Sequence, residues 1–507
     1  MRRLSLTLAA CAGIASCASG PDPITSLGTV PDLPAAAFAP DEPILSPGQL
    51  REDLTSLYQG LQEAHFDLYA RQTKPAYDRL FDATLNSFDQ PLRPSEAVFL
   101  FQRFTAFGNI AHARVEGVSA VWSRYREAGG KALPVFPRVR GDRMFVQLSY
   151  DPSVAPGDEI IAVNGEPIGP LLQRLYRQIS ADNAYLAGSL LEFSFPFHLL
   201  EDQGPADTIS LTLSRGGGAS REVAVETINL ETLRARTATE SDQGDVFVFD
   251  ASGRKAEMLD DGIAYLQPGP FYGIENPENP WDNSAFKAFI DESFDTFLAE
   301  GARALIIDLR QNPGGDNSFS DHMIAWFADE PFRFVSDFQV RSSPQAQASN
   351  QARLDLNPDM AGGVSSQLAE GYNATPYGET FSFEIPLTEP RLGVRFEGPV
   401  YAIIDRYSYS NAVNVAAILQ DYGFATITGE ETSDLATSYG AMETFTLPHS
   451  GLTVGFPKAL IIRPSGDRSD RGVRPDISIP SAPFAAEDVF LQRTLDAVRE
   501  ELGSGPK

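Results

Sequence analysis

The stretch ALIIDLRQNPGG, residues 304–315, decides the fold expected for this 507-residue chain. Its first six residues form a mostly apolar run, which is typical of a strand buried on both faces of a parallel sheet. Two consecutive glycines end the following loop, and glycine lets a backbone approach a ligand closely. The stretch VYAIIDRYSYSN, residues 400–411, repeats this plan, with a helix expected from Asn411 to about Tyr422. Two such units predict an α/β core.

Other segments differ in character from this core. Leucines recur at helical spacing from Leu50 to Leu61, which predicts a helical N-terminal region. Short β-rich runs follow, and RGGG at residues 215–218 predicts a hairpin turn between two of them. The predicted divisions are a signal peptide (1–17), a Pro/Ala-rich tether (18–47), an N-terminal helical domain (48–127), a β-rich domain (128–230), a linker (231–257), the α/β core (258–482), and a C-terminal helix and tail (483–507).

Composition narrows the function classes. The chain is 42% hydrophobic, as expected of a globular protein. It carries 68 acidic and 40 basic residues, a net charge of −28. Nucleic-acid binding usually requires a basic footprint, so we expect no nucleic-acid partner.

The first seventeen residues resemble an export signal. Two arginines precede a short apolar run, which is too short to span a bilayer. The segment IASC, residues 14–17, resembles a bacterial lipoprotein lipobox, which implies lipidation of Cys17, with Cys11 as the alternative. We expect the mature chain to be anchored in the bacterial cell envelope, facing the periplasm. Ala18, rather than an aspartate, favours the outer membrane.

The sequence lacks the motifs of several common kinds of catalytic and binding site. The five histidines are widely scattered and both cysteines lie in the signal, so neither a zinc site nor a disulfide framework is expected. The sequence contains no Walker loop, no dinucleotide-binding fingerprint and no Gly-x-Ser-x-Gly elbow. We therefore expect no metal and no cofactor.

The two loops of the core remain as candidates. A serine at the start of a helix can be a simple N-cap. It can also be a nucleophile whose oxyanion is held by free backbone N–H groups. The residues alone leave both interpretations open.

Four motifs in order resemble peptidase family S41, the tail-specific and C-terminal-processing proteases with their tricorn-like relatives. They are PGDEIIAVNG at 156–165, the stretch ending RQNPGG at 310–315, SYSNA at 408–412, and GVRPD at 472–476. The resemblance implies a ClpP/crotonase-like core, with residues 128–230 as a PDZ-like domain that could bind extended peptide by strand addition.

The resemblance also implies site residues. Ser410 takes the nucleophile position, with Ser408 as the alternative. The oxyanion hole maps to the backbone of Gly314 and Gly315 and to the N–H of Asn411.

Either a lysine or a histidine could be the general base that accepts the proton of Ser410. Tail-specific relatives place a lysine twenty-five residues after the serine, where this chain has Leu435. Lys458 lies in an apolar run, and we expect its head group to be solvated at a strand edge. NIAHARV, residues 109–115, resembles the segment that carries the histidine of the tricorn-like branch, which implies His112 as the base.

The acid that would orient the histidine is the least well defined residue of the predicted site. The family commonly has glutamate where this chain has Ser469. Asp470 is the predicted acid, with Asp467 as the alternative. The predicted function is a Ser–His–acid peptidase that hydrolyses peptide bonds of exported proteins or peptides through an acyl-enzyme intermediate. The alternatives are an inactive peptide- or ligand-binding lipoprotein, and an esterase or amidase using the same site.

Overall fold

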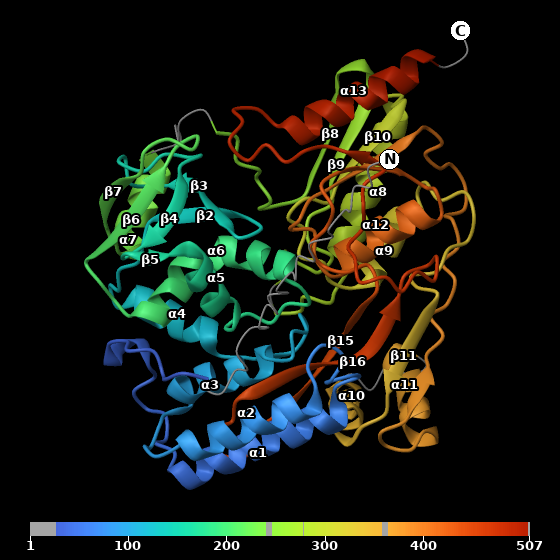
Figure 1. The fold of residues 1–507 in the computed structure, drawn as a ribbon. Coiled ribbons are helices and arrows are strands. Elements are labelled where there is room, and N and C mark those ends of the chain that lie inside the picture. The colour runs from blue at the N-terminus through green and yellow to red at the C-terminus, as the bar shows by residue number, and fades with distance from the viewer. Residues whose placement is uncertain (1–26, 240–245, 277, 357–362, 505–507) are drawn as a thin grey trace, which may run out of the picture.

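Three β-sheets and their helices make up the protein, whose structure is a computed structural model (Figure 1). The predicted signal peptide and Cys17 lie outside the described residues. Within the described part of the chain, no helix is long and apolar enough to cross a bilayer. The described residues are 27–239, 246–276, 278–356 and 363–504.

The N-terminal region is helical, as predicted. Helix α1 begins with a capping box, in which the Ser46 hydroxyl accepts from the Gln49 N–H and the Gln49 side chain accepts from the Ser46 N–H. Its leucines, including Leu50 and Leu61, are fully buried. The helices here are η1 (Ala35–Ala37), α1 (Pro47–Ala64), α2 (Lys74–Ser87), α3 (Pro94–Ala106) and α4 (Val118–Glu127).

A six-stranded antiparallel sheet, called here the middle sheet, occupies most of the predicted β-rich domain. Its order is β2-β3-β4-β6-β7, with β5 paired to β4. The predicted hairpin is confirmed, because β6 and β7 pair antiparallel around Gly216 and Gly217, both at positive φ. The elements are β2 (Val135–Arg140), β3 (Arg143–Ser149), β4 (Glu159–Val163), β5 (Glu166–Pro167), α5 (Ile168–Tyr176), α6 (Ala184–Gln203), β6 (Thr208–Ser214), β7 (Arg221–Glu226) and α7 (Leu230–Thr239).

The core sheet confirms the predicted α/β plan. Its order is β17-β14-β13-β10-β9-β8, and every pair is parallel except β8 with β9. Strands β10 and β13 are neighbours, so the loops after them leave the sheet at the same edge. The elements are β8 (Lys255–Leu259), η2 (Asp260–Gly262), β9 (Ile263–Gln267), α8 (Ser284–Ala299), β10 (Ala304–Asp308), α9 (Asn317–Ile324), β13 (Val400–Ile404), α12 (Asn411–Asp421), β14 (Thr426–Gly429), β17 (Ile477–Ser478) and α13 (Val489–Ser504).

A third sheet is built around the long strand β16, which pairs with β1, β11 and β15 (Figure 1). Strand β1 belongs to the N-terminal segment that follows His112. Because Arg114 of β1 pairs with Gly455 of β16, this segment is part of the third sheet. The elements are β1 (Arg114–Val115), β11 (Asp337–Arg341), α10 (Pro344–Leu356), α11 (Val364–Ala374), β12 (Thr380–Ser382), β15 (Ser438–Thr446) and β16 (Thr453–Ile462).

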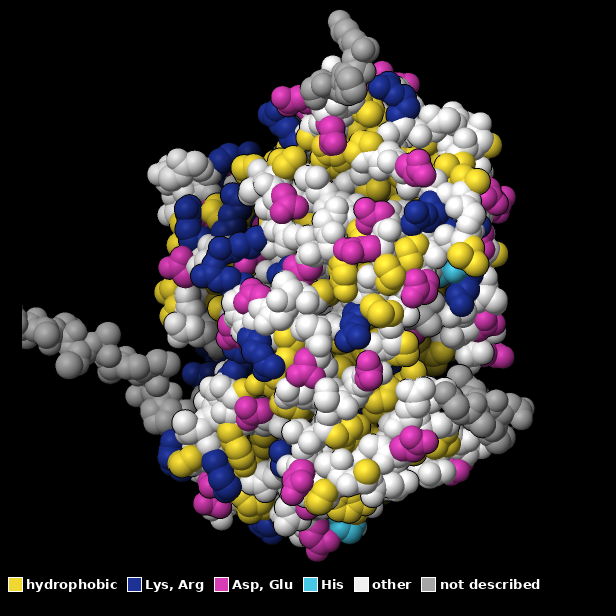
Figure 2. All heavy atoms as spheres, turned by 90° about the vertical axis from the view of Figure 1, so that its right-hand side faces the viewer, with side chains coloured by type: hydrophobic (Ala, Val, Ile, Leu, Met, Phe, Trp, Pro, Cys, Tyr) yellow, Lys and Arg dark blue, Asp and Glu magenta, His cyan; other side chains and the backbone are white. Residues whose placement is uncertain are grey.

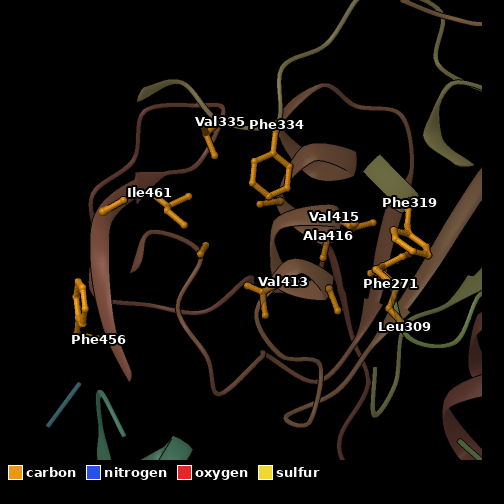
Figure 3. Packing of buried hydrophobic residues seen from close by; sticks show 14 of the residues in the cluster. Phe271, Leu309, Phe319, Phe334, Val335, Val413, Val415, Ala416, Phe456 and Ile461 are labelled. Carbon is orange, nitrogen blue, oxygen red and sulfur yellow. The ribbon is translucent and has the colours of Figure 1, made fainter. Parts of the chain in front are cut away.

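Helix α12 lies in the centre of the main hydrophobic cluster (Figure 3). Its Val413, Val415 and Ala416 are fully buried, between the side of the core that carries Leu309 and the strand that carries Phe456. Burial of a side chain of this size contributes about 1.5–3 kcal/mol. The start of α12 is therefore held firmly in place.

The surface is mixed in charge. On the face seen in Figure 2, acidic and basic side chains are interspersed among apolar ones. The negative net charge is thus not gathered into one patch on that face.

Candidate active site

Ser410 stands at the end of the loop between β13 and α12, in an unusual backbone conformation. Its φ is 53° and its ψ is −121°, a region that a non-glycine residue enters at a cost of about 1–3 kcal/mol. Ser410 is the N-cap of α12, yet its side chain makes no capping hydrogen bond. Its N–H donates instead to Asp434 Oδ2 at 2.6 Å. The backbone of Ser410 is thus held in a strained conformation, and its hydroxyl does not cap the helix. This combination fits a nucleophile better than a helix cap.

Ser408, the alternative nucleophile, is structural. It is fully buried, its hydroxyl donates to the Leu309 carbonyl at 2.8 Å, and it accepts from the Asp405 N–H at 3.2 Å. Leu309 precedes the glycine loop, so Ser408 ties the two loops together.

Asp405 also joins these loops. Its Oδ1 accepts from the N–H groups of Gln311, at 3.1 Å, and of Tyr407 and Ser408, both at 3.0 Å. Burial raises the pKa of Asp405 to about 6, against the lowering effect of these donors. The shape of both loops is therefore set by one buried carboxyl.

The glycine loop presses against the start of α12. A Cβ on Gly314 would lie 2.6 Å from the Asn411 nitrogen, and a Cβ on Gly315 would lie 2.1 Å from the Phe271 carbonyl oxygen. Both glycines have positive φ, 85° and 139°. A side chain at Gly314 would push the loop away from Ser410 and Asn411, and one at Gly315 would push it away from Phe271, which explains the pair of glycines.

The predicted oxyanion donors need one correction. The Gly314 N–H donates to Asn312 Oδ1 at 2.9 Å, so it is already engaged. The N–H groups of Gly315 and Asn411 have no hydrogen-bond partner among the described residues. These two donors remain for an oxyanion.

His112 lies against the nucleophile loop. Its ring stacks on that of Tyr409, with centroids 5.4 Å apart and an interplanar angle of 23°. The ring is buried, and its Nδ1 has no partner among the described residues. Burial lowers the pKa of His112, which outweighs the raising effect of Asp182. A neutral imidazole beside the serine's own loop can accept a proton.

Asp182, in the loop between α5 and α6, is the carboxyl that acts electrostatically on His112. Its Oδ2 accepts from the Ala111 N–H at 3.3 Å, one residue from the histidine. Burial, and next the nearby Asp434, raise the pKa of Asp182 to about 6. Asp182 could not be recognised from the sequence, because no motif surrounds it.

Asp470, the predicted acid, is placed elsewhere. Both its oxygens accept from the Arg71 guanidinium at 2.7 Å, and its side chain is 69% exposed. The Arg71 Nε in turn lies 3.3 Å from Asp182 Oδ1. No interaction between Asp470 and His112 is found among the described residues, so Asp470 reaches the site only through Arg71. The alternative, Asp467, is bonded to Ser469 at the surface.

The prediction for Lys458 is wrong. Its head group is buried in β16 and forms an ion pair with Glu443 on β15. The head group is enclosed because α10 packs on this face of the sheet, where its Ser349 and Arg353 also bind Glu443. Leu435, where tail-specific relatives have lysine, is buried as well.

A cavity of about 1120 Å³ opens beside the site. Ala111 and Tyr409 line it near the site, and apolar side chains of α4 and α6, such as Trp122 and Phe197, line it farther away. Its size and apolar walls suit an extended chain better than a small polar molecule.

Fold and site together define a serine-type peptidase. Residues 278–479 match the model of peptidase family S41. The predicted family, α/β fold class and enzyme class are thus confirmed. No curated protein matches the sequence.

Two solved structures of CPAF extend the likeness in fold to most of the chain. Mature CPAF is 17% identical, with a TM-score of 0.60, covering 90% of this chain and 96% of that one. Mature CPAF complexed with lactacystin is 18% identical, with a TM-score of 0.59, covering 90% and 97%. The photosystem II D1 C-terminal processing protease is 14% identical, with a TM-score of 0.43, covering 87% and 95%.

Proposed function

We propose that the protein hydrolyses peptide bonds of polypeptides through an acyl-enzyme formed on Ser410. The observation that carries this proposal is the strained, uncapped Ser410, whose neighbour Tyr409 stacks on the buried, neutral ring of His112. His112 takes the hydroxyl proton as Ser410 attacks the scissile carbonyl, and then gives it to the leaving amine. Water, deprotonated in the same way, releases the acyl group.

Asp182 and two backbone N–H groups complete the mechanism. Asp182 orients His112 and stabilises its protonated form. In this proposal Asp182 therefore replaces Asp470, the acid predicted from the sequence. The N–H groups of Gly315 and Asn411 stabilise the oxyanion, each contributing on the order of 3 kcal/mol. The apolar cavity beside Tyr409 would hold the substrate chain.

The pH dependence of serine labelling tests this mechanism. Burial lowers the pKa of His112 from 6.5, so the base form persists to lower pH than in a free histidine. We expect the rate of fluorophosphonate labelling to be level at neutral pH and to fall on acidification, with a midpoint below 6.5. Labelling rates measured from about pH 4 to 9 would show this. A midpoint above about 8 would point to a different base, such as a lysine.

We further propose that Cys17 carries the lipid that anchors the chain to the cell envelope. The support is the lipobox-like segment at residues 14–17. Cys17→Ala is expected to move the protein from the membrane fraction to the soluble fraction, with no diacylglyceryl adduct in its mass spectrum. Retention in the membrane by Cys17→Ala, and release by Cys11→Ala, would instead make Cys11 the lipidation site.

A further inference from the structure

Strand β2 is an outer strand of the middle sheet, paired on one side with β3. The free edge of such a strand is where a peptide adds by strand pairing. In this protein the backbone groups on the free edge are already hydrogen-bonded at Val139. The Val139 N–H donates to Glu192 Oε1 at 2.6 Å. The Val139 carbonyl accepts from Arg406 Nη1 at 2.9 Å. Two residues earlier, Pro137 has no N–H to offer.

The two side chains that occupy this edge come from different parts of the fold. Glu192 is on α6, which packs on the middle sheet, whereas Arg406 belongs to the loop that carries Ser410. They also bond to each other, with Arg406 Nη1 2.9 Å from Glu192 Oε1. The edge is thus closed jointly by α6 and by the loop that carries Ser410.

Further buried groups complete a charge-balanced cluster. Arg138 on β2 donates to the Tyr407 hydroxyl at 2.8 Å, and Tyr407 donates to Glu192. Glu430 accepts from Arg406 at 2.9 Å and from Arg138 at 3.0 Å. The Glu192 and Arg138 side chains are only 2% and 3% exposed. Two arginines and two glutamates thus hold one another between the middle sheet and the nucleophile loop.

We propose that Glu192 and Arg406 are positioning residues for the proposed peptidase reaction, and that the predicted PDZ-like domain clamps the nucleophile loop instead of binding a peptide C-terminus at β2. This proposal rests on the proposed function of Ser410. Glu192 reaches the reaction through Arg406 and Tyr407, which lie four and three residues before the serine. The substrate is then taken up without recognition of a free terminal carboxylate by this edge.

Glu192→Gln in the full mature chain tests the clamp. The amide keeps the shape but removes the charge that faces two arginines. We expect labelling of Ser410 by a fluorophosphonate to slow by about 10- to 100-fold, with kcat reduced and KM little changed. The matched control is Glu201→Gln, on the same helix, where a buried glutamate pairs with Arg103 on α3 at 2.7 Å. This control should label at the wild-type rate.

Amide hydrogen exchange tests, without any catalytic activity, whether Glu192 holds the nucleophile loop in place. In a Ser410→Ala background, Glu192→Gln should raise amide exchange in residues 405–411, whereas Glu201→Gln should not. Unchanged exchange in this loop would overturn the clamp even if wild type is active. Faster exchange together with no labelling of wild type would keep the clamp and overturn the peptidase mechanism instead.

A peptide pair tests the closed edge. A substrate with a free C-terminal carboxylate and its carboxamide should be cleaved at equal rates. Faster cleavage of the carboxylate form, abolished by a substitution on β2, would overturn the proposal that this edge is closed.

Discussion

Replacing Ser410 by alanine is expected to abolish fluorophosphonate labelling and peptide cleavage while leaving the chain folded. The hydroxyl makes no hydrogen bond to any described residue, so its loss should change the free energy of unfolding by no more than about 0.5 kcal/mol. Loss of a serine nucleophile lowers kcat on the order of 10⁶-fold. Intact-mass detection of the adduct, cleavage of a fluorogenic peptide and thermal unfolding together measure this.

Ser408→Ala is the matched control, two residues away. This substitution removes a buried hydroxyl bonded to the Leu309 carbonyl and the Asp405 N–H, so it should destabilise the fold by about 1–3 kcal/mol. The folded variant should still label. If labelling survives in Ser410→Ala and disappears in folded Ser408→Ala, the nucleophile is Ser408.

Asp182→Asn is expected to have the second largest effect. Without its charge, the carboxyl that faces His112 can no longer stabilise the protonated imidazole, and kcat should fall by about 10³- to 10⁴-fold. KM should change little, because Asp182 is buried and does not line the cavity beside the site. Steady-state kinetics on the same fluorogenic peptide would measure both.

Asp470→Asn is the comparison that separates the two acids. Arg71 would lose an exposed partner and keep Asp182, and exposed ion pairs contribute about 0–1 kcal/mol. Its kcat should therefore stay within about tenfold of wild type. The reverse ranking, with Asp470→Asn the slower enzyme, would return the orienting role to Asp470.

Much of the core could be predicted because its signals are local. An apolar run followed by paired glycines or by a serine at a helix start defines a strand–loop–helix unit within about 20 residues. The loops after β10 and β13 were placed correctly for this reason. Even the correction at Gly314 has a local cause, since the side chain of an asparagine commonly bonds the backbone N–H two residues on.

The remaining site residues depend on tertiary contacts. Asp182 comes from a loop between two helices and meets His112 only after the middle sheet and the N-terminal helices have packed together. Asp470 looked suitable because it precedes a family motif, but sequence proximity does not show that Arg71 would take both its oxygens. Lys458 was misjudged because its partner, Glu443, is supplied by a neighbouring strand.

The pairing of β1 with β16 holds in place the segment that carries His112, the proposed general base. His112 precedes this short strand by two residues, and neither His112 nor Asp182 lies within residues 278–479. The nucleophile and the oxyanion donors are thus made by one part of the chain, and the proton-transfer groups by another. In the proposed mechanism, a chain in which these two parts have not docked lacks the groups that move the proton, so proteolytic activity requires both parts to be folded and packed together.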